Sequence, residues 1–143
     1  MDEVGSWVAT AAITELIVRY AVLCDAGQWD EVAALYADDA RMSRPTAPDE
    51  FISGRDAILA SFRARPPRAA RHVVANVLVT LDSDIDARAT SQILLFTGTT
   101  HGAGLPTLST TPPLIGTYHD RLLRTNSGWR FTERRGSLDF RAP

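Results

Sequence analysis

The stretch His72-Val73-Val74-Ala75-Asn76-Val77-Leu78-Val79 decides the fold class, because the period of the apolar residues changes here. Alternation over these eight residues predicts an extended strand with one apolar face and one mixed face. The predicted apolar face holds Val73, Ala75, Val77 and Val79, and the mixed face holds His72, Val74, Asn76 and Leu78. The chain before this strand has the period of helices, and the chain after it keeps the period of strands.

Three helices are predicted before the strand. From Ser6 to Cys24, apolar residues recur every three or four positions, and Ala26-Gly27 stops the helix because glycine readily takes the left-handed conformation. A second helix is expected from Trp29 to Tyr36, with two acids in its first turn, where the helix dipole favours them. A third is expected from Arg55 to Arg65. Residues 41–50 contain two prolines and are expected to be irregular.

Three more strands are predicted after it. They run from Ala87 to Thr99, from Leu114 to Arg124 and from Trp129 to Leu138, and the last two are joined by the turn Thr125-Asn126-Ser127-Gly128. Residues 100–113 are predicted to form a loop. Helices followed by antiparallel strands indicate an α+β fold, with the helices packed on one face of a sheet. A chain of 143 residues is long enough for one core, so we expect a single domain over residues 1–143.

The composition excludes several classes of function. All 15 basic residues are arginine, so chemistry that depends on a lysine, such as a Schiff base or a P-loop, is excluded. The net charge of −2 argues against nucleic acid as a partner. The single cysteine fits a reducing cytoplasm, and the acidic start MDEVGSW does not resemble a secretory signal. Because no apolar run approaches about 18 residues, we expect no membrane partner.

Two titratable residues are candidates for chemistry. Asp25 follows an apolar run in the last turn of the first helix, where the helix dipole opposes a carboxylate, although a solvated turn aspartate is the plain alternative. His72 opens the strand, and histidine is the side chain best suited to proton transfer near neutral pH. The plain alternative is a hydrogen-bonded structural histidine. The three histidines show no metal-ligand spacing, so we expect no metal site.

Three other residues have both a structural and a functional interpretation. Tyr20 lies on the apolar stripe of the first helix and is either core or part of a pocket. Arg135 shares a predicted strand face with Trp129 and Phe131, provided that the strand has no bulge, and would need an anion or an ion-pair partner there. Cys24 has no positive neighbour in sequence and is expected to be a buried structural thiol.

Taken in order, these segments resemble the SnoaL-like family of the nuclear transport factor two-like superfamily. The resemblance extends from Ile13 to Arg135. The segments that carry it are Ile13 to Tyr20, Asp25, Gly27, Trp29, Leu35 to Ala40, Arg71 to Asn76, Gly116 to Asp120 and Gly128 to Arg135. It implies a cone, in which a strongly curved antiparallel or mixed sheet is wrapped around the three helices and a pocket opens at one end.

The resemblance also implies a site. In the subset similar to scytalone dehydratase and bile-acid 7α-dehydratase, an aspartate near the end of the first helix meets the histidine of the Arg-His strand, and Asp25 and His72 match these positions. The resemblance implies that Tyr20 and Arg135 bind the substrate, and we expect Asn76 and Tyr118 to do so as well. The sequence departs from the bile-acid enzymes at Leu95 and Phe96, where those enzymes carry a further acidic residue, so the substrate is left open.

The function expected from these residues is that of a cofactor-independent lyase or isomerase, of dehydratase or cyclase type, acting on a mostly apolar or cyclic small molecule. His72 would remove a proton and Asp25 would orient it. The alternatives are a non-catalytic ligand-binding module, a small structural subunit of a ring-hydroxylating oxygenase and, last, an epoxide hydrolase of related fold. If the His72 side of the strand faces the pocket, the apolar face is the outer face of the sheet, which further suggests a homodimer or homotrimer.

Overall fold

The computed structural model describes residues 1–143 and contains three helices and seven strands. The helices are α1 (Glu3–Asp25), α2 (Trp29–Ala33) and α3 (Arg55–Arg63). The strands are β1 (Tyr36–Arg44), β2 (Ala47–Ser53), β3 (Ala69–Leu81), β4 (Asp86–His101), β5 (Gly104–Leu108), β6 (Leu114–Thr125) and β7 (Gly128–Leu138). The predicted α+β class is confirmed, and the boundaries of each helix differ from the predicted ones by at most three residues.

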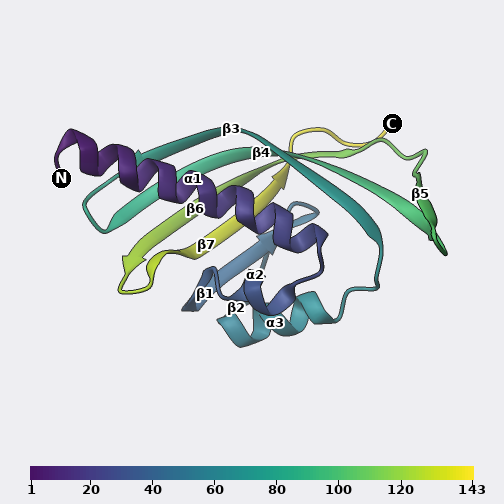
Figure 1. Ribbon diagram of the computed structural model, residues 1–143, viewed down its shortest axis with the longest axis horizontal. Coiled ribbons are helices and arrows are strands. Elements are labelled where there is room, and N and C mark those ends of the chain that lie inside the picture. Colours follow the sequence, from purple (N-terminus) through teal and green to yellow (C-terminus); the bar gives the residue numbers. More distant parts are fainter.

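The strands form one curved sheet in the order β2-β1-β7-β6-β4-β3, with β5 paired to β4. Only β1 and β7 run parallel, so the sheet is mixed. Figure 1 shows α1 lying along one face of the sheet, while α2 and α3 lie together below one end of it, close to β1 and β2. The sheet curves around the helices without closing into a barrel, which confirms the predicted cone.

The core lies between α1 and the sheet. Ile13 and Ile17, one helical turn apart on α1, are fully buried, as are Tyr36 of β1 and Phe131 of β7. Burying an aliphatic side chain of this size stabilises the fold by roughly 1.5–3 kcal/mol. The apolar residues that recur every three or four positions in the sequence therefore form the face of α1 that packs against the sheet.

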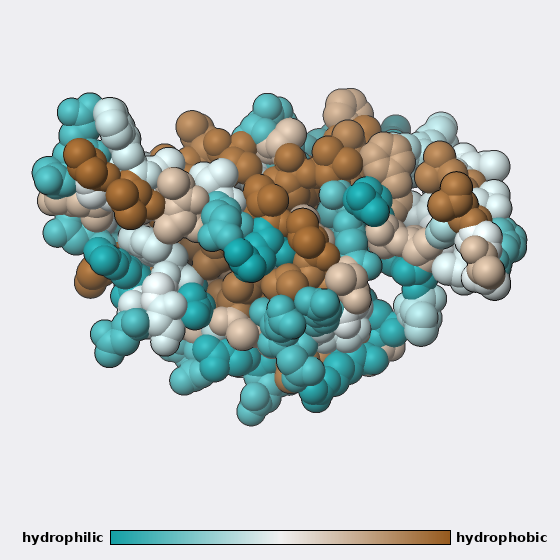
Figure 2. All heavy atoms as spheres, in the orientation of Figure 1, coloured by the Kyte–Doolittle hydropathy of each residue, from teal (hydrophilic) through white to brown (hydrophobic).

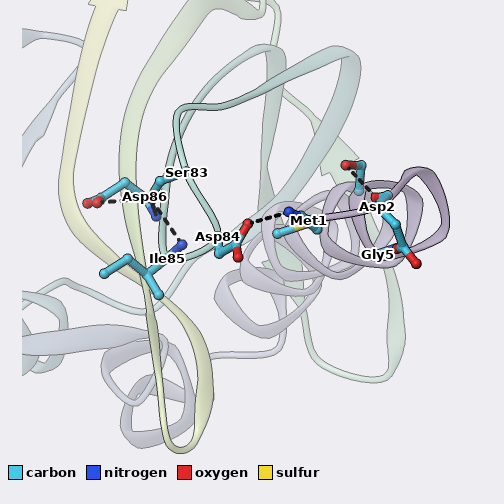
Figure 3. Close-up of polar contacts among 8 residues, drawn as sticks. Met1, Asp2, Gly5, Ser83, Asp84, Ile85 and Asp86 are labelled. Atoms are coloured by element: carbon cyan, nitrogen blue, oxygen red, sulfur yellow. Dashed lines mark hydrogen bonds and ion pairs between the residues drawn. The ribbon is translucent and has the colours of Figure 1, made fainter.

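Specific contacts and backbone conformations mark both ends of α1. At its start, the Asp2 carboxylate accepts a hydrogen bond from the Gly5 backbone N–H, and the Met1 amino group lies 3.1 Å from Asp84 Oδ1 in the turn between β3 and β4 (Figure 3). At its end, Gly27 has a φ of +67°, which glycine adopts without strain. The helix therefore ends at Asp25, two residues before Gly27.

By length and composition alone, α1 could cross a membrane, since an 18-residue window of it has a mean hydropathy of 1.5. The expectation that no segment reaches this length is therefore wrong. The same helix supplies eight buried side chains, and core helices commonly pass such a test. Its outer side also carries exposed apolar residues, among them Val4, Val8 and Val22, and Figure 2 shows apolar and polar side chains interspersed over the face of the molecule on which α1 lies.

Two segments that were expected to be irregular are strands. Within residues 41–50, β1 continues to Arg44 and β2 begins at Ala47, so Pro45 lies in the tight turn between the two strands and Pro48 lies in β2. On one side β1 pairs with β2, and on the other it pairs with β7, which begins about 90 residues later in the chain and gives no local sequence signal. Within residues 100–113, β5 folds back on β4.

A β-bulge divides β3 into two halves. Ala75 pairs with Gln92 and Leu78 with Thr90, so β3 has one more residue than β4 between these pairs. Asn76 lies in this bulge with a φ of +51°, in the left-handed region that asparagine tolerates better than most residues. Beyond the bulge, residues predicted to point outward point inward, and residues predicted to point inward point outward.

The predicted outer face of β3 is consequently wrong beyond Asn76. Val77 and Val79 pack against the core, whereas Leu78 is 68% exposed. Before the bulge the prediction holds, since Val73 is exposed and His72 points to the inner side. β3 therefore has no outer apolar face that contains all four of the predicted residues, Val73, Ala75, Val77 and Val79.

Candidate active site

Asp25 and His72 meet where the end of α1 approaches β3. The Nδ1 atom of His72 lies 2.6 Å from Asp25 Oδ1, and the backbone N–H of His72 donates to Asp25 Oδ2 over 2.8 Å. Both side chains are nearly buried, with 11% and 13% of their surface exposed for His72 and Asp25. The guanidinium of Arg71 lies at the edge of the pair, with Nε 3.7 Å from Asp25 Oδ2. The contact expected between the two residues is present.

The environment of His72 favours its neutral form. Burial lowers the pKa of His72 below its ordinary value of 6.5, and the hydrogen bond to the Asp25 carboxylate opposes this only in part. Since a carboxylate can only accept, the hydrogen on the neutral ring is placed on Nδ1. The lone pair is then on Nε2, for which the structure shows no partner within the protein. A neutral imidazole oriented in this way can accept a proton.

His72 lines a cavity of about 400 Å³. The wall also contains Tyr118 of β6 and the apolar side chains Ile93, Leu95 and Leu114. A cavity of this size can hold a small organic molecule. The expected pocket is present, with His72 and Tyr118 both on its wall.

Two other predicted binding residues do not line this cavity. Tyr20 is a core residue whose hydroxyl lies 2.8 Å from that of Tyr36, and burial raises its pKa. It lies behind the cavity wall, with its ring 6.3 Å from that of Tyr118. Asn76 is wrongly predicted, because the bulge turns it outward, where it donates to the Gln92 side chain. In an unbroken strand Asn76 would lie on the same face as His72, and the bulge removes it from that face.

The inward orientation predicted for Arg135 is wrong, and Arg134 takes that position. Arg134 is 1% exposed, whereas Arg135 points outward to Asp49 at 3.3 Å. Leu122 pairs with Phe131 but Arg121 pairs with Glu133, so β7 has an extra residue at Thr132. Without this bulge Asp120 would face Glu133, and like charges directly opposite each other destabilise a strand pair. With it, Asp120 faces Arg134.

Arg134 is buried between an acidic partner and aromatic rings. Its Nε lies 3.0 Å from Asp120 Oδ1, and its guanidinium carbon lies 3.8 Å from the centre of the Tyr118 ring and 4.2 Å from that of Tyr20. Burial raises the pKa of Asp120 to about 6 although the guanidinium opposes the rise. Arg134 Nη1 is buried without a hydrogen-bond partner. The pair therefore supports Tyr118, and through it the cavity wall, from behind.

Three arginines that were not predicted also line the cavity. They are Arg44 at the end of β1, and Arg65 and Arg68 in the segment between α3 and β3. They are far apart in the sequence, and in a chain whose basic residues are all arginine no single one stands out. Asp120 could have been noticed, since alternation places it on one strand face with Tyr118 and Leu122, where a carboxylate needs a cation.

The remaining reactive side chains do not form a second site. Cys24 is buried, and burial raises its pKa to about 12, which agrees with a structural thiol. His101 and His119 are exposed and contact Thr107 and Ser137. No group of three or more histidine, cysteine, aspartate or glutamate side chains is arranged to hold a metal ion.

The fold and site define a class of small α+β proteins in which an open, curved sheet surrounds a cavity and a carboxylate–imidazole pair lies at its wall. More specifically, the chain belongs to the SnoaL-like domain family, whose model matches residues 8–135. A search of curated proteins found no match.

Solved structures share this fold at low sequence identity. A candidate scytalone dehydratase from Novosphingobium aromaticivorans is 22% identical, with a TM-score of 0.80 over 95% of this chain and 87% of that one. A type 3 hexachlorocyclohexane dehydrochlorinase from Novosphingobium barchaimii is 15% identical, with a TM-score of 0.80 over 99% and 94%. A candidate dehydratase of the nuclear transport factor two-like family from Streptomyces avermitilis is 14% identical, with a TM-score of 0.79 over 94% and 99%.

Proposed function

We propose that the protein is a cofactor-independent lyase or isomerase of dehydratase or cyclase type. The observation that carries the proposal is the 2.6 Å contact between Asp25 and a His72 ring that also forms part of a cavity wall. The family and its dehydratase-like structural neighbours agree with this class of reaction.

In the proposed reaction, His72 Nε2 takes a proton from a carbon next to a carbonyl group. The electrons of the broken C–H bond form an enolate, and the imidazolium produced is stabilised by the Asp25 carboxylate. In a dehydration, a hydroxyl group on the neighbouring carbon then leaves with its bonding electrons and takes the proton back from His72 as water. In an isomerisation, His72 returns the proton to another carbon. A positioned general base of this kind contributes about 10²–10⁴-fold to the rate.

Proton exchange tests the proposal without knowledge of the natural substrate. The protein is incubated in D₂O with a panel of cyclic ketones and β-hydroxy ketones, and mass spectrometry follows deuterium uptake and loss of water. We expect exchange with at least one member of the panel for the wild-type protein and none for His72→Gln. Exchange that is equally fast in His72→Gln would refute the role of His72.

A binding module without catalysis is the alternative. Its prediction is that ligands bind while no panel compound exchanges a proton, and that Asp25→Asn leaves ligand affinity unchanged. A small subunit of a ring-hydroxylating oxygenase predicts in addition a stable complex with a larger subunit. We propose a homo-oligomer for the protein alone, which light scattering after size-exclusion chromatography measures directly.

A further inference from the structure

Three guanidinium groups surround the cavity without a carboxylate partner. Nine of the chain's 15 arginines lie within 4.0 Å of an acidic side chain, and Arg44, Arg65 and Arg68 are among the six that do not. All three line the cavity that contains His72, and no acidic residue is among its lining residues. The chain as a whole has a net charge of −2, so this concentration of positive charge is local.

Two of these arginines are held in place. Arg44 Nη2 donates to the carbonyl oxygen of Ser61 over 3.2 Å, while its Nε is buried without a partner. The Arg65 guanidinium carbon lies 4.5 Å from the centre of the Phe62 ring, and Pro66 and Pro67 restrict the backbone that follows. Because these two side chains are already held in place, binding a ligand to them costs little side-chain conformational entropy.

The charges are close enough to act on one another and on His72. Besides burial, Arg65 and Arg68 contribute to lowering the pKa of Arg44, and the same two arginines contribute to lowering the pKa of His72. Arg65, Arg68 and His72 also line a second hollow of about 230 Å³, on whose wall Asp25 lies. The segment between α3 and β3 thus brings positive charge to both hollows that His72 lines.

We propose that the ligand of this cavity is an organic anion, whose carboxylate or phosphate group is bound by Arg44, Arg65 and Arg68 while its apolar part lies against Ile93, Leu95 and Leu114. Guanidinium groups suit such oxyanions because their N–H groups match the geometry of two oxygens. The proposal rests on the proposed function only in taking this ligand to be the substrate. Two features distinguish this cavity from one that suits a neutral polar ligand. Arg44 Nε is unpaired, and no acidic residue lines the wall.

Binding of three matched probes tests the proposal on the wild-type protein. Naphthoate, naphthamide and naphthyl phosphate share one apolar ring system, which fits a cavity of about 400 Å³, and differ in the polar group. None of them carries the acidic C–H bond that His72 would attack, so calorimetry measures binding alone. The result does not depend on whether the protein is a catalyst, and proton exchange can fail or succeed independently of it.

We expect naphthoate or naphthyl phosphate to bind at least about 10-fold more tightly than naphthamide, and the tighter of the two anions identifies the oxyanion. Arg65→Gln and Arg68→Gln should each weaken anion binding about 5- to 10-fold and leave naphthamide unaffected. Arg124→Gln, which removes an exposed arginine that does not line the cavity, is the control.

Equal affinity for the anions and the amide would overturn the proposal. Anion binding that is unchanged in both cavity variants, or lost equally in Arg124→Gln, would also overturn it. So would the absence of binding by both anions up to about 10 mM, since that limit corresponds to a negligible affinity.

Discussion

Asp25 holds His72 at two points, because one carboxylate oxygen contacts the imidazole Nδ1 and the other accepts a hydrogen bond from the backbone N–H of the same residue. The carboxylate therefore sets both the orientation of the ring and the position of β3 relative to the end of α1. Replacing it affects the direction in which the imidazole presents its lone pair.

Asp25→Asn tests this orientation. An asparagine amide can donate to Nδ1, which would move the ring hydrogen to Nε2 and remove the base from the cavity. We expect the rate of proton exchange to fall by about 10²–10⁴-fold, as for loss of a general base. Asp25→Glu, which keeps a carboxylate, is the matched variant and should lose less. An Asp25→Asn protein that folds by circular dichroism and exchanges at the wild-type rate would contradict the assignment.

The pH dependence follows from the lowered pKa of His72. Because the neutral ring is the base, activity should rise with pH through a midpoint below 6.5 and then remain level toward neutral pH. For stability, the unfolded state binds more protons than the folded state between the folded pKa and 6.5. The contribution of His72 to the free energy of unfolding therefore falls as the pH drops below 6.5. An NMR titration of the ring protons gives the pKa directly, and a midpoint above 6.5 would contradict both expectations.

The bulge at Thr132 predicts opposite outcomes for two neighbouring arginines. Arg134→Ala leaves Asp120 buried without its cation and should cost about 3–5 kcal/mol of unfolding free energy. Arg135→Ala removes an ion pair with an Asp49 side chain that is 90% exposed and should cost less than about 1 kcal/mol. Urea denaturation of both variants measures the difference.

A double replacement checks the cause. If the loss in Arg134→Ala comes from an unpaired buried charge, Arg134→Met combined with Asp120→Leu should be more stable than either single replacement. If Arg135→Ala proved to be the more damaging change, β7 would lack the bulge and the predicted unbroken alternation would be correct.

The bulge in β3 makes its own prediction, because Asn76 has a φ of +51°. Asn76→Val should reduce the free energy of unfolding by about 1–2 kcal/mol, since a β-branched residue is strained in this region. Asn76→Gly should be within about 0.5 kcal/mol of the wild type, since glycine relieves the strain at an entropic cost. Both variants lose the contact with Gln92 equally, so their difference isolates the backbone. Equal stabilities would show that the strand takes another path at this position.

Much of the fold could be predicted from the sequence. The helical spacing around Ile13 and Ile17, the stop at Gly27 and the turn at Gly128 are local signals, and the structure contains each of them. The candidate pair could also be predicted, because the resemblance placed Asp25 at the end of a helix and His72 at the inner side of a strand. β1 and β5 could not, because partners distant in the chain or next to a tight turn hold them.

By itself, the sequence determined the change from helical to strand period, the order of the elements and the residue types available for proton transfer. The tertiary structure decided which side chains face the cavity. At Asn76 and Thr132 a single extra residue exchanges the faces of a strand, and simple alternation contains no sign of it, because a bulge forms only when a strand is paired with its neighbour. The grouping of Arg44, Arg65 and Arg68 around His72 has the same origin, since it depends on where folding brings β1 and the segment before β3 together.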